Sequence, residues 1–354
     1  EGAQISTWEM SRFALTMLDF MCTSDERRRD LYENKSFFKF VRGEAYSQRF
    51  QRYLNSSRFM VAMDARKGSA CTIGNKVLQI MLDFSRPKRQ NDRVLNGPTS
   101  TQWLEPWEQY LRSRGVRFHF GQTVNALDVD VTEQRIAGAR VGPKNERVEA
   151  EYFIASLPLE RLAPVVSKEL AALDRSLAVF KEARKLTAWM VGAQYFLRRD
   201  VKVCDGHIAF PDAPWALSAI SQAQFWAQGQ GTFAKRFGDG TVAGVLSVDI
   251  SDWETMAPRL RKTAAQCGSA PEVLNEVWAQ IKEGLNGTEE VLLRDDDLVY
   301  AHLDENISFA DYGVQNSAPL LVHPPGSWHV RPPAAPAERA GPRPSGCARV
   351  HPRR

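Results

Sequence analysis

The 354-residue chain has few cysteines and no long apolar run. Its five cysteines are widely spaced and include no C-x-x-C pair. Such a pattern is typical of reduced thiols in the cytoplasm and fits neither a disulfide framework nor a zinc ribbon. No stretch approaches the about 18 consecutive apolar residues of a membrane-spanning helix, and no secretory signal peptide is visible. The sequence therefore predicts a cytoplasmic protein without a transmembrane helix.

The chain also lacks a charge excess of one sign in most of its length. It holds 46 basic and 42 acidic residues, of which six arginines and one glutamate lie in residues 331–354. The rest holds 40 basic and 41 acidic residues and is nearly neutral, which argues against a nucleic-acid-binding protein. Residues 331–354 also contain six prolines and almost no large apolar side chain. This composition predicts a disordered tail.

Motifs of several common catalytic centres are missing. The six histidines form no H-E-x-x-H or H-x-H pair, so no metal site is predicted, and no G-x-S-x-G of a serine hydrolase occurs. The one glycine pattern of dinucleotide-binding type, G-Q-G-T-F-A at Gly229–Ala234, follows no clean apolar strand and is interpreted as a loop. Asp295–Asp297 is interpreted as an acidic turn before a strand rather than as a cation site.

The most informative stretch runs from Val94 to Leu127. Thr99 and Gln102 fit a capping box, and apolar residues then recur at the three- and four-residue spacing of a helix. Pro106 suits the start of a helix better than its interior, so the first true helical turn is placed at Glu105-Pro106. Val116–Phe120 alternates as a half-buried strand does.

Other segments have the periodicity of helices or strands. Helices are predicted over Ile5–Cys22, Ser47–Met63, Leu159–Leu173 (interrupted at Pro164) and from Ser269 to about Gly284. Leu186–Phe196, Trp215–Ile220 and Thr241–Ile250 are rich in β-branched and aromatic residues and are predicted to be strands of one sheet. Trp189, Trp215, Phe225 and Trp226 would line an apolar tunnel or, as large aromatic residues at strand spacing more often do, fill an ordinary core.

The order of these blocks resembles FAD-dependent amine oxidases and carotenoid (phytoene) desaturases. The first block comprises a glycine turn, a helix and a strand, represented by Gly97, Leu104, Leu111, Gly115, Val116, Gly121, Val124 and Leu127. Arg135–Gly142 and Arg147–Leu157 resemble the next two strands of the family, the second ending in a turn at Ala155–Pro158. Ser247–Trp253 and Pro319–Pro332 resemble later blocks in family order. The resemblance covers the chain from Glu1 to Arg331.

The resemblance implies FAD as the cofactor. The residues that match cofactor-side motifs are Gly97, Val124, Ser156, Leu157, Pro158 and, more loosely, Trp328. Close approach of the flavin to the backbone would explain Gly97, and backbone contacts would explain the others; each could equally be a turn or core position. No catalytic acid or base is assigned, because the flavin carries the chemistry.

The implied fold is α+β or α/β: an incomplete FAD-binding, Rossmann-like domain of the glutathione-reductase type with an inserted substrate domain of mixed sheet and helices. The expected division is residues 1–93, helical part of the substrate domain; 94–160, partial FAD-binding domain; 161–290, substrate domain; 291–330, return towards the FAD domain; and 331–354, disordered tail. In this scheme the sheet of the substrate domain lies under the substrate.

The implied activity is oxidation of a C–H/C–H or C–N unit by hydride transfer to FAD. The desaturase-like branch implies an apolar isoprenoid or carotenoid precursor as substrate, and with it contact with a membrane surface. Relatives carry a G-x-G-x-x-G fingerprint before this region and a flavin-contacting segment after it, so we expect a chain truncated at both ends and inactive on its own. Two alternatives stay open: a flavin amine oxidase, and a non-catalytic remnant that lacks the cofactor.

Overall fold

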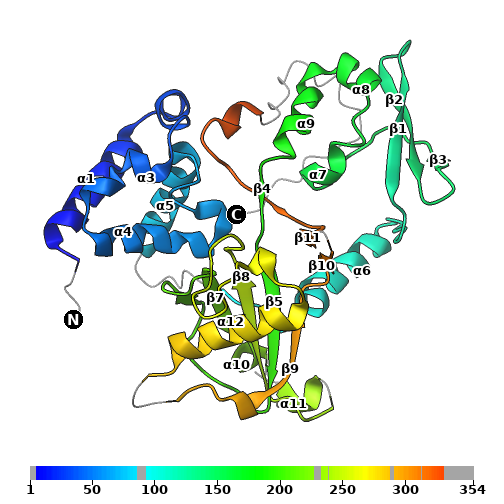
Figure 1. Cartoon of the computed structure of the whole chain (residues 1–354). Coiled ribbons are helices and arrows are strands. Elements are labelled where there is room, and N and C mark those ends of the chain that lie inside the picture. The colour runs from blue at the N-terminus through cyan, green and yellow to red at the C-terminus, as the bar shows by residue number, and fades with distance from the viewer. Residues whose placement is uncertain are drawn as a thin grey trace. The chain divides into compact units, whose positions relative to one another are not determined.

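The computed structural model describes residues 5–85, 93–226, 233–237, 239–287, 291–311 and 313–330. The chain divides into two compact units, Glu1–Phe120 with Leu186–Trp328, and Gly121–Lys185 with His329–Arg354. Both units combine helices with antiparallel strands, so the α+β class is confirmed (Figure 1). No helix within the described ranges is long and apolar enough to cross a membrane. The predicted disordered tail and most of the Gly229–Ala234 loop lie outside the described residues.

The first unit begins with a helical lobe, residues 5–85. Its helices are α1 (Thr7–Cys22), α2 (Asp25–Arg27), α3 (Phe37–Phe40), α4 (Gln48–Asn55) and α5 (Ala70–Phe84), with short turns at Arg28–Tyr32, Gly43–Ala45, Ser56–Phe59 and Val61–Met63. The predicted helix over Ile5–Cys22 is confirmed, and Ser6 with Glu9 forms a capping box at its start. Aromatic side chains dominate the core of the lobe, among them Phe20 and Phe50, which are fully buried.

A five-stranded sheet forms the second part of this unit, and we call it the substrate-lobe sheet. Its strands are β5 (Val191–Leu197), β6 (Ile208–Phe210), β7 (Leu217–Ser221), β8 (Gly244–Ile250) and β9 (Leu298–Leu303), in the order β6-β7-β8-β5-β9. The three predicted strands are confirmed as β5, β7 and β8. The sheet was expected to be mixed, but every pairing in it is antiparallel.

Helix α12 (Ala270–Leu285) packs against one face of the substrate-lobe sheet (Figure 1). The helix begins as predicted: the Ser269 hydroxyl accepts a hydrogen bond from the Glu272 N–H at 3.4 Å, and a proline occupies the first turn. Val273, Val277 and Ile281 recur on one face and are fully buried against the sheet. The apolar face of α12, which repeats every 3.6 residues, and the alternate apolar residues of the strands therefore pack into one core.

Two predictions around α6 (Glu105–Ser113) are wrong. Thr99 has helical backbone angles and caps nothing, because the chain is already wound there into a short π-helical turn, Ser100–Leu104; α6 itself starts at Glu105, as Pro106 predicted. Val116–Phe120 is not a strand. Its residues are mostly exposed, and none of the described strands lies beside it to supply the hydrogen-bonded ladder that a strand needs.

The remaining elements of the first unit are short. They are the strand pairs β4 (Thr187–Ala188) with β12 (Leu320–Leu321) and β10 (Ile307–Ala310) with β11 (Gly313–Asn316), the helices α10 (Ala223–Trp226) and α11 (Phe233–Arg236), and turns at Ala264–Gln266, Asp295–Asp297 and Ser327–Val330. The turn at Asp295–Asp297 precedes β9, as predicted.

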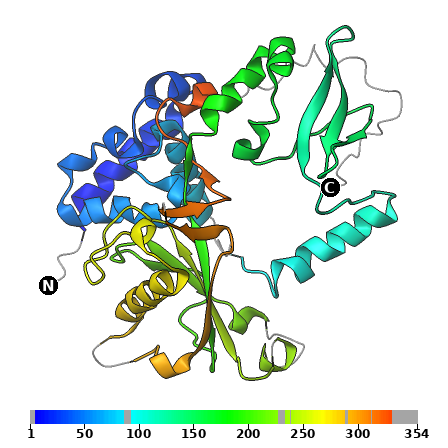
Figure 2. The same cartoon turned by 45° about the vertical axis from the view of Figure 1, so that its right-hand side comes forward.

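The second unit contains a three-stranded antiparallel sheet and short helices (Figure 2). Its elements are β1 (Val124–Asp130), β2 (Arg135–Val141), β3 (Glu146–Val148), α7 (Leu159–Leu162), α8 (Lys168–Leu173) and α9 (Phe180–Ala183), with a turn at Arg175–Val179. The helix predicted to break at Pro164 does so, between α7 and α8. The strand predicted over Arg147–Leu157 ends at Val148, and residues 149–157 continue without a pairing partner among the described strands.

Candidate functional site

One face of the substrate-lobe sheet packs against α12 in the core. Successive side chains of a strand point to opposite sides, and alternate residues of β5 from Val191 to Leu197 are buried under α12. Among them, the Tyr195 hydroxyl donates to the Leu274 carbonyl at 2.8 Å, and its ring stacks on Trp278 with the ring centroids 5.2 Å apart. A ligand of this sheet would therefore lie on the opposite face.

That opposite face carries a row of side chains across four strands. Ser247 of β8 pairs with Gln194 of β5 on one side and with Ile220 of β7 on the other. His302 of β9 lies opposite Gln194 and extends the row. The Ser247 hydroxyl is buried and has no hydrogen-bond partner among the described residues. Buried polar atoms normally have a partner, so this hydroxyl marks the row as a place where a ligand group would be stabilised.

A half-buried carboxylate, Asp249, lies two residues further along β8. It pairs with Gly192 of β5 and Ser218 of β7, so it shares the face of Ser247. Burial raises the pKa of Asp249, while the nearby charge of His207 acts in the opposite direction. No hydrogen bond from a described residue reaches this carboxylate. A desolvated titratable group with so little compensation is typical of functional sites.

A pocket of about 330 Å³ lies at the row that contains Gln194. Gln194 and Ile220 line it from the sheet, Gln222 and Trp226 line it from the chain after β7, and the segment Arg93–Thr99 provides the remaining wall. Its size falls at the low end of the range for small-molecule sites, about 300–1,000 Å³. Its lining mixes apolar side chains with two amides and one guanidinium, which would orient a ligand by a few polar contacts.

Gly97, one of the predicted cofactor residues, lines this pocket. A Cβ atom built on Gly97 would lie 2.7 Å from Cγ of Gln102. An alanine at this position would only require the exposed Gln102 side chain to move, and this local constraint holds whether or not a ligand approaches from the pocket side.

Four other predicted cofactor residues lie in the second unit, apart from the unit that contains Gly97 and Trp328. Val124 begins β1 and is half-buried, whereas Ser156, Leu157 and Pro158 are exposed. The turn predicted at Ala155–Pro158 is an extended segment that leads into α7. Proline at position 158 favours this outcome, since it disfavours helical angles in the residue before it.

Trp328 packs onto the helical lobe. Its backbone N–H donates to the carboxylate of Glu33 at 2.8 Å, and the Arg29 guanidinium lies 4.8 Å from the centre of the Trp328 ring. Glu33 is fully buried; its carboxylate also accepts the Ser69 hydroxyl at 2.8 Å, and its carbonyl accepts the Gly326 N–H at 3.0 Å. These contacts explain the position of Trp328 without a cofactor.

Two of the three acidic residues before β9 form ion pairs. Asp295 accepts from Lys282 and from the Trp278 indole, and Asp297 accepts from Arg199 at 2.7 Å. Within the described parts of the chain, no three His, Cys, Asp or Glu side chains gather as a metal site.

The residues present fit FAD only in part. A dinucleotide is normally held by a glycine-rich turn between a parallel strand and a helix, and every strand pairing in the described residues is antiparallel. The pocket at Gly97 would admit one ring system rather than a whole dinucleotide. What this chain offers is a contact surface for one end of a flavin or for a substrate.

Sequence reasoning missed Gln194, Ser247 and Asp249 as site residues. The segment around Ser247 entered only as part of a resemblance. The signal was nevertheless present, because β8 reads L-S-V-D-I, with the serine and the aspartate on one face between buried apolar residues. A buried strand with two polar residues at two-residue spacing predicts a polar face.

Two solved structures share this fold. An oxidoreductase from Methanosarcina mazei superposes with a TM-score of 0.50 and 13% identity over 84% of this chain and 61% of its own. A double mutant of putrescine oxidase, made in a redesign of cofactor binding, superposes with a TM-score of 0.51 and 10% identity over 86% and 63%. The chain thus spans somewhat under two thirds of the length of either structure. No protein-family profile matches the sequence, and no curated protein matches it.

Proposed function

We propose that this chain is the substrate-binding part of a flavin-dependent oxidoreductase, and that the face of the substrate-lobe sheet opposite α12 binds the substrate together with one end of the flavin. Support comes from the fold shared with two oxidoreductases and from the blocks that resemble FAD-dependent enzymes. The observation that carries the proposal is the pocket at Gln194 and Gly97, set on the polar face of the sheet that α12 leaves uncovered. When bound, FAD would supply the acceptor for the hydride that leaves the substrate.

The side chains of this chain would bind and orient the substrate. Gln194 and the unpartnered Ser247 hydroxyl would supply hydrogen bonds. Ile220 and Trp226 would cover the apolar part of the substrate and exclude water, which strengthens the polar contacts. No group of this chain is required to act as a general acid or base.

The resemblance favours an apolar isoprenoid or carotenoid-precursor substrate. The aliphatic part of the pocket wall, Val94, Leu95, Pro98 and Ile220, is compatible with an apolar group. Among the described residues, the one charged side chain that lines the pocket is a cation, Arg93, which would repel an ammonium group and so also favours an apolar substrate.

An amine substrate is the second candidate, and Asp249 favours it. Its carboxylate lies on the same face of the sheet and lacks a hydrogen-bond donor, so an ammonium group would compensate its charge. The fold shared with a putrescine oxidase adds support. Comparing ligands on one variant, Asp249→Asn, separates the two candidates: the Kd for putrescine should rise at least tenfold, whereas binding of an apolar polyene should be unaffected.

Flavin uptake is the direct test. The purified chain is titrated with FAD while the flavin fluorescence is followed, and the absorbance of the bound fraction is then recorded. We expect saturable binding that Gln194→Leu weakens at least fivefold. Gln315→Leu on the exposed strand β11 is the matched control and should bind as the unaltered chain does.

A monodisperse, colourless chain that takes up no FAD would exclude oxidoreductase activity of this chain by itself. It would leave the non-catalytic remnant as the better account. Equal weakening by Gln194→Leu and Gln315→Leu would instead remove the sheet face as the site.

A further inference from the structure

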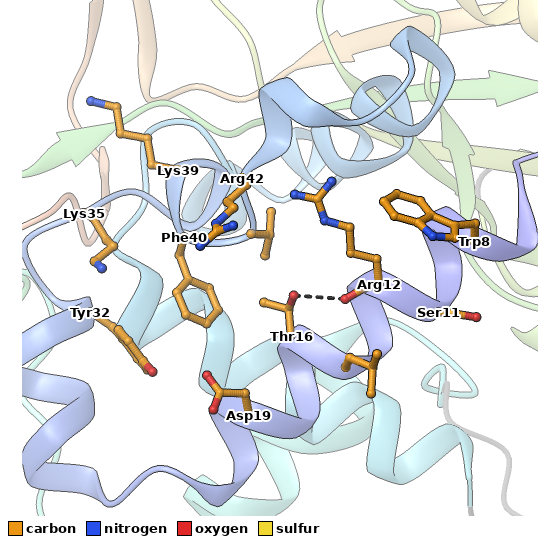
Figure 3. Close-up of a pocket in the computed structure, with 12 residues that line it drawn as sticks. Trp8, Ser11, Arg12, Thr16, Asp19, Tyr32, Lys35, Lys39, Phe40 and Arg42 are labelled. Carbon is orange, nitrogen blue, oxygen red and sulfur yellow. Dashed lines mark hydrogen bonds between the residues drawn. The ribbon is translucent and has the colours of Figure 1, made fainter.

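The helical lobe contains a second, larger pocket that the proposed oxidoreductase function does not use. It has a volume of about 690 Å³ and lies between α1 and the chain from Tyr32 to Arg42 (Figure 3). Trp8 and Arg12 of α1 form one wall, and Phe40 and Arg42 contribute to the other. The volume is well within the range for small-molecule sites.

Positive charge gathers at this pocket in an otherwise neutral body. Arg12, Lys35, Lys39 and Arg42 line it, against a single carboxylate, Asp19. None of the four basic side chains forms an ion pair with a carboxylate among the described residues. In Figure 3 the guanidinium groups of Arg12 and Arg42 lie between Trp8 and Lys35, whereas the ammonium of Lys39 points away from them.

Arg12 is held in place by aromatic rings rather than by a carboxylate. Its guanidinium lies 5.5 Å from the centre of the Trp8 ring and 5.0 Å from that of Tyr46. Stacking of this kind orients the group and leaves its N–H donors unused. Lys35 is similar, with its ammonium 5.4 Å from the centre of the Tyr32 ring.

The nearest buried carboxylate on α1, Glu9, is fully engaged elsewhere. It accepts the Ser47 N–H at 2.7 Å and both the N–H and the hydroxyl of Ser6. Chiefly through the Ser47 bond, the pKa of Glu9 is lowered to about 2. No ion pair joins Glu9 and Arg12 among the described residues, because the Glu9 carboxylate is held by the N-terminal cap of α1 and by Ser47.

Arg42 occupies a strained position. Its backbone is left-handed, with φ 56° and ψ 51°, and its N–H donates to the Lys39 carbonyl at 3.1 Å. A residue with a Cβ is destabilised in this region of backbone angles. The next residue, Gly43, is fixed by close packing, since a Cβ there would lie 2.4 Å from the Phe38 ring. The turn therefore holds an arginine at the pocket in spite of the strain.

The same pocket has an apolar wall that is open to solvent. Trp8 and Leu15 line it and are 65% and 66% exposed, and the half-buried ring of Phe40 lies in Figure 3 on the same side as Lys35. Exposed apolar side chains next to unpaired cations fit a ligand that has an anionic head and an apolar body.

We propose that this pocket binds the phosphate group of an amphipathic molecule, with Arg12, Lys35 and Arg42 around the phosphate and Trp8, Leu15 and Phe40 along the apolar part. Several cations at one pocket suit a dianion such as a phosphate monoester better than a monoanion, and guanidinium groups match phosphate geometry. A soluble alkyl phosphate and a phospholipid headgroup share this chemistry. The site is independent of the flavin surface on the substrate-lobe sheet.

The test is calorimetric titration of the full chain with octyl phosphate, with inorganic phosphate and octyl glucoside as single-feature probes. We expect octyl phosphate to bind at least tenfold more tightly than either probe. Arg12→Gln and Arg42→Gln should each weaken octyl phosphate at least tenfold. Arg42→Gln guards against a folding defect in Arg12→Gln, because Arg42 is exposed and stacks on none of the described rings. Arg52→Gln, an exposed arginine on α4 outside the pocket, is the matched control and should leave binding unchanged.

Binding to lipid vesicles distinguishes a phospholipid headgroup from a soluble alkyl phosphate as the ligand. If phosphatidylcholine vesicles containing phosphatidic acid bind the chain, pure phosphatidylcholine vesicles do not, and Arg42→Gln abolishes the difference, the ligand is a lipid headgroup. Binding of octyl phosphate alone assigns a soluble ligand. The proposal is overturned if no phosphate probe binds, if octyl glucoside binds as tightly as octyl phosphate, or if Arg52→Gln weakens binding as much as Arg42→Gln.

Discussion

Asp249 lies on β8 and Asp252 follows it three residues later. We expect substitution by asparagine to change the free energy of unfolding in opposite directions at these two positions. Asp249 is half-buried, and no described residue donates a hydrogen bond to it, so its ionised form is destabilised in the folded protein. Asp252 accepts from Arg58 at 3.2 Å, from the N–H and hydroxyl of Thr255 at 2.8 and 2.6 Å, and from the Glu254 N–H at 3.0 Å. Asp249→Asn should stabilise the protein, and Asp252→Asn should destabilise it.

The magnitudes follow from these partners. An unsatisfied buried polar group costs about 1–3 kcal/mol, and Asp249 is only half-buried, so we expect Asp249→Asn to raise the free energy of unfolding by about 1 kcal/mol at pH 8. Asp252→Asn keeps one acceptor oxygen but loses charge-assisted bonds worth about 1.5–3 kcal/mol each. We expect a loss of about 2 kcal/mol.

The pH dependence of Asp249→Asn provides the sharper check. Because the pKa of Asp249 is raised in the folded state, the aspartate costs nothing below the pKa of the unfolded chain, near 3.8, and destabilises the fold increasingly as pH rises through the folded pKa. The gain from Asp249→Asn should therefore grow between pH 4 and pH 8. Urea unfolding followed by tryptophan fluorescence measures it, since Trp215 and Trp253 are buried in this core. A gain independent of pH, or a loss at pH 8, would refute the assignment of Asp249 as an uncompensated charge.

Three further substitutions test other contacts. Glu33→Ala leaves the Trp328 N–H and the Ser69 hydroxyl without acceptors in a buried place and should cost about 3 kcal/mol in urea unfolding, whereas Glu44→Ala on the surface of the same lobe should cost almost nothing. Gly244→Ala should lower the thermal midpoint, by a free energy of about 1–3 kcal/mol, because its Cβ would lie 2.4 Å from the Arg199 carbonyl oxygen; Gly192→Ala, with nothing within 4 Å, should be nearly neutral. Glu9→Gln should destabilise the chain at pH 7 and have a vanishing effect as pH falls from 4.5 towards 2, since the pKa of Glu9 is lowered to about 2 by the Ser47 N–H; an equal effect at both ends would contradict that cause.

Local patterns sufficed for elements whose stabilising contacts lie within the segment or on one face. The helices α1 and α12 and the strands β5, β7 and β8 carry clear periods and caps, and each was predicted from them. Val116–Phe120 has the alternation of a strand but none of the described strands beside it, and alternation alone cannot supply one.

The candidate site was harder to predict for a related reason. Asp249 becomes distinctive only because the register puts it opposite Gly192 and Ser218, and register is a property of three strands rather than of one. Gly97 lines the candidate pocket, but the side chain that packs against it, Gln102, lies within the same short turn, and its predicted contact with a cofactor stays a prediction. Whether Val124 and Ser156–Pro158 contact a cofactor stays a prediction.

The hydrogen bond between Glu33 and Trp328 also affects when the helical lobe can complete its fold during synthesis. Trp328 lies 295 residues after Glu33 in the sequence. At a synthesis rate of about 5–20 residues per second, the amide that completes this hydrogen bond follows the glutamate by about 15–60 s. Throughout that interval the helical lobe lacks one of the donors to this side chain, so its final closure coincides with the arrival of the last described residues.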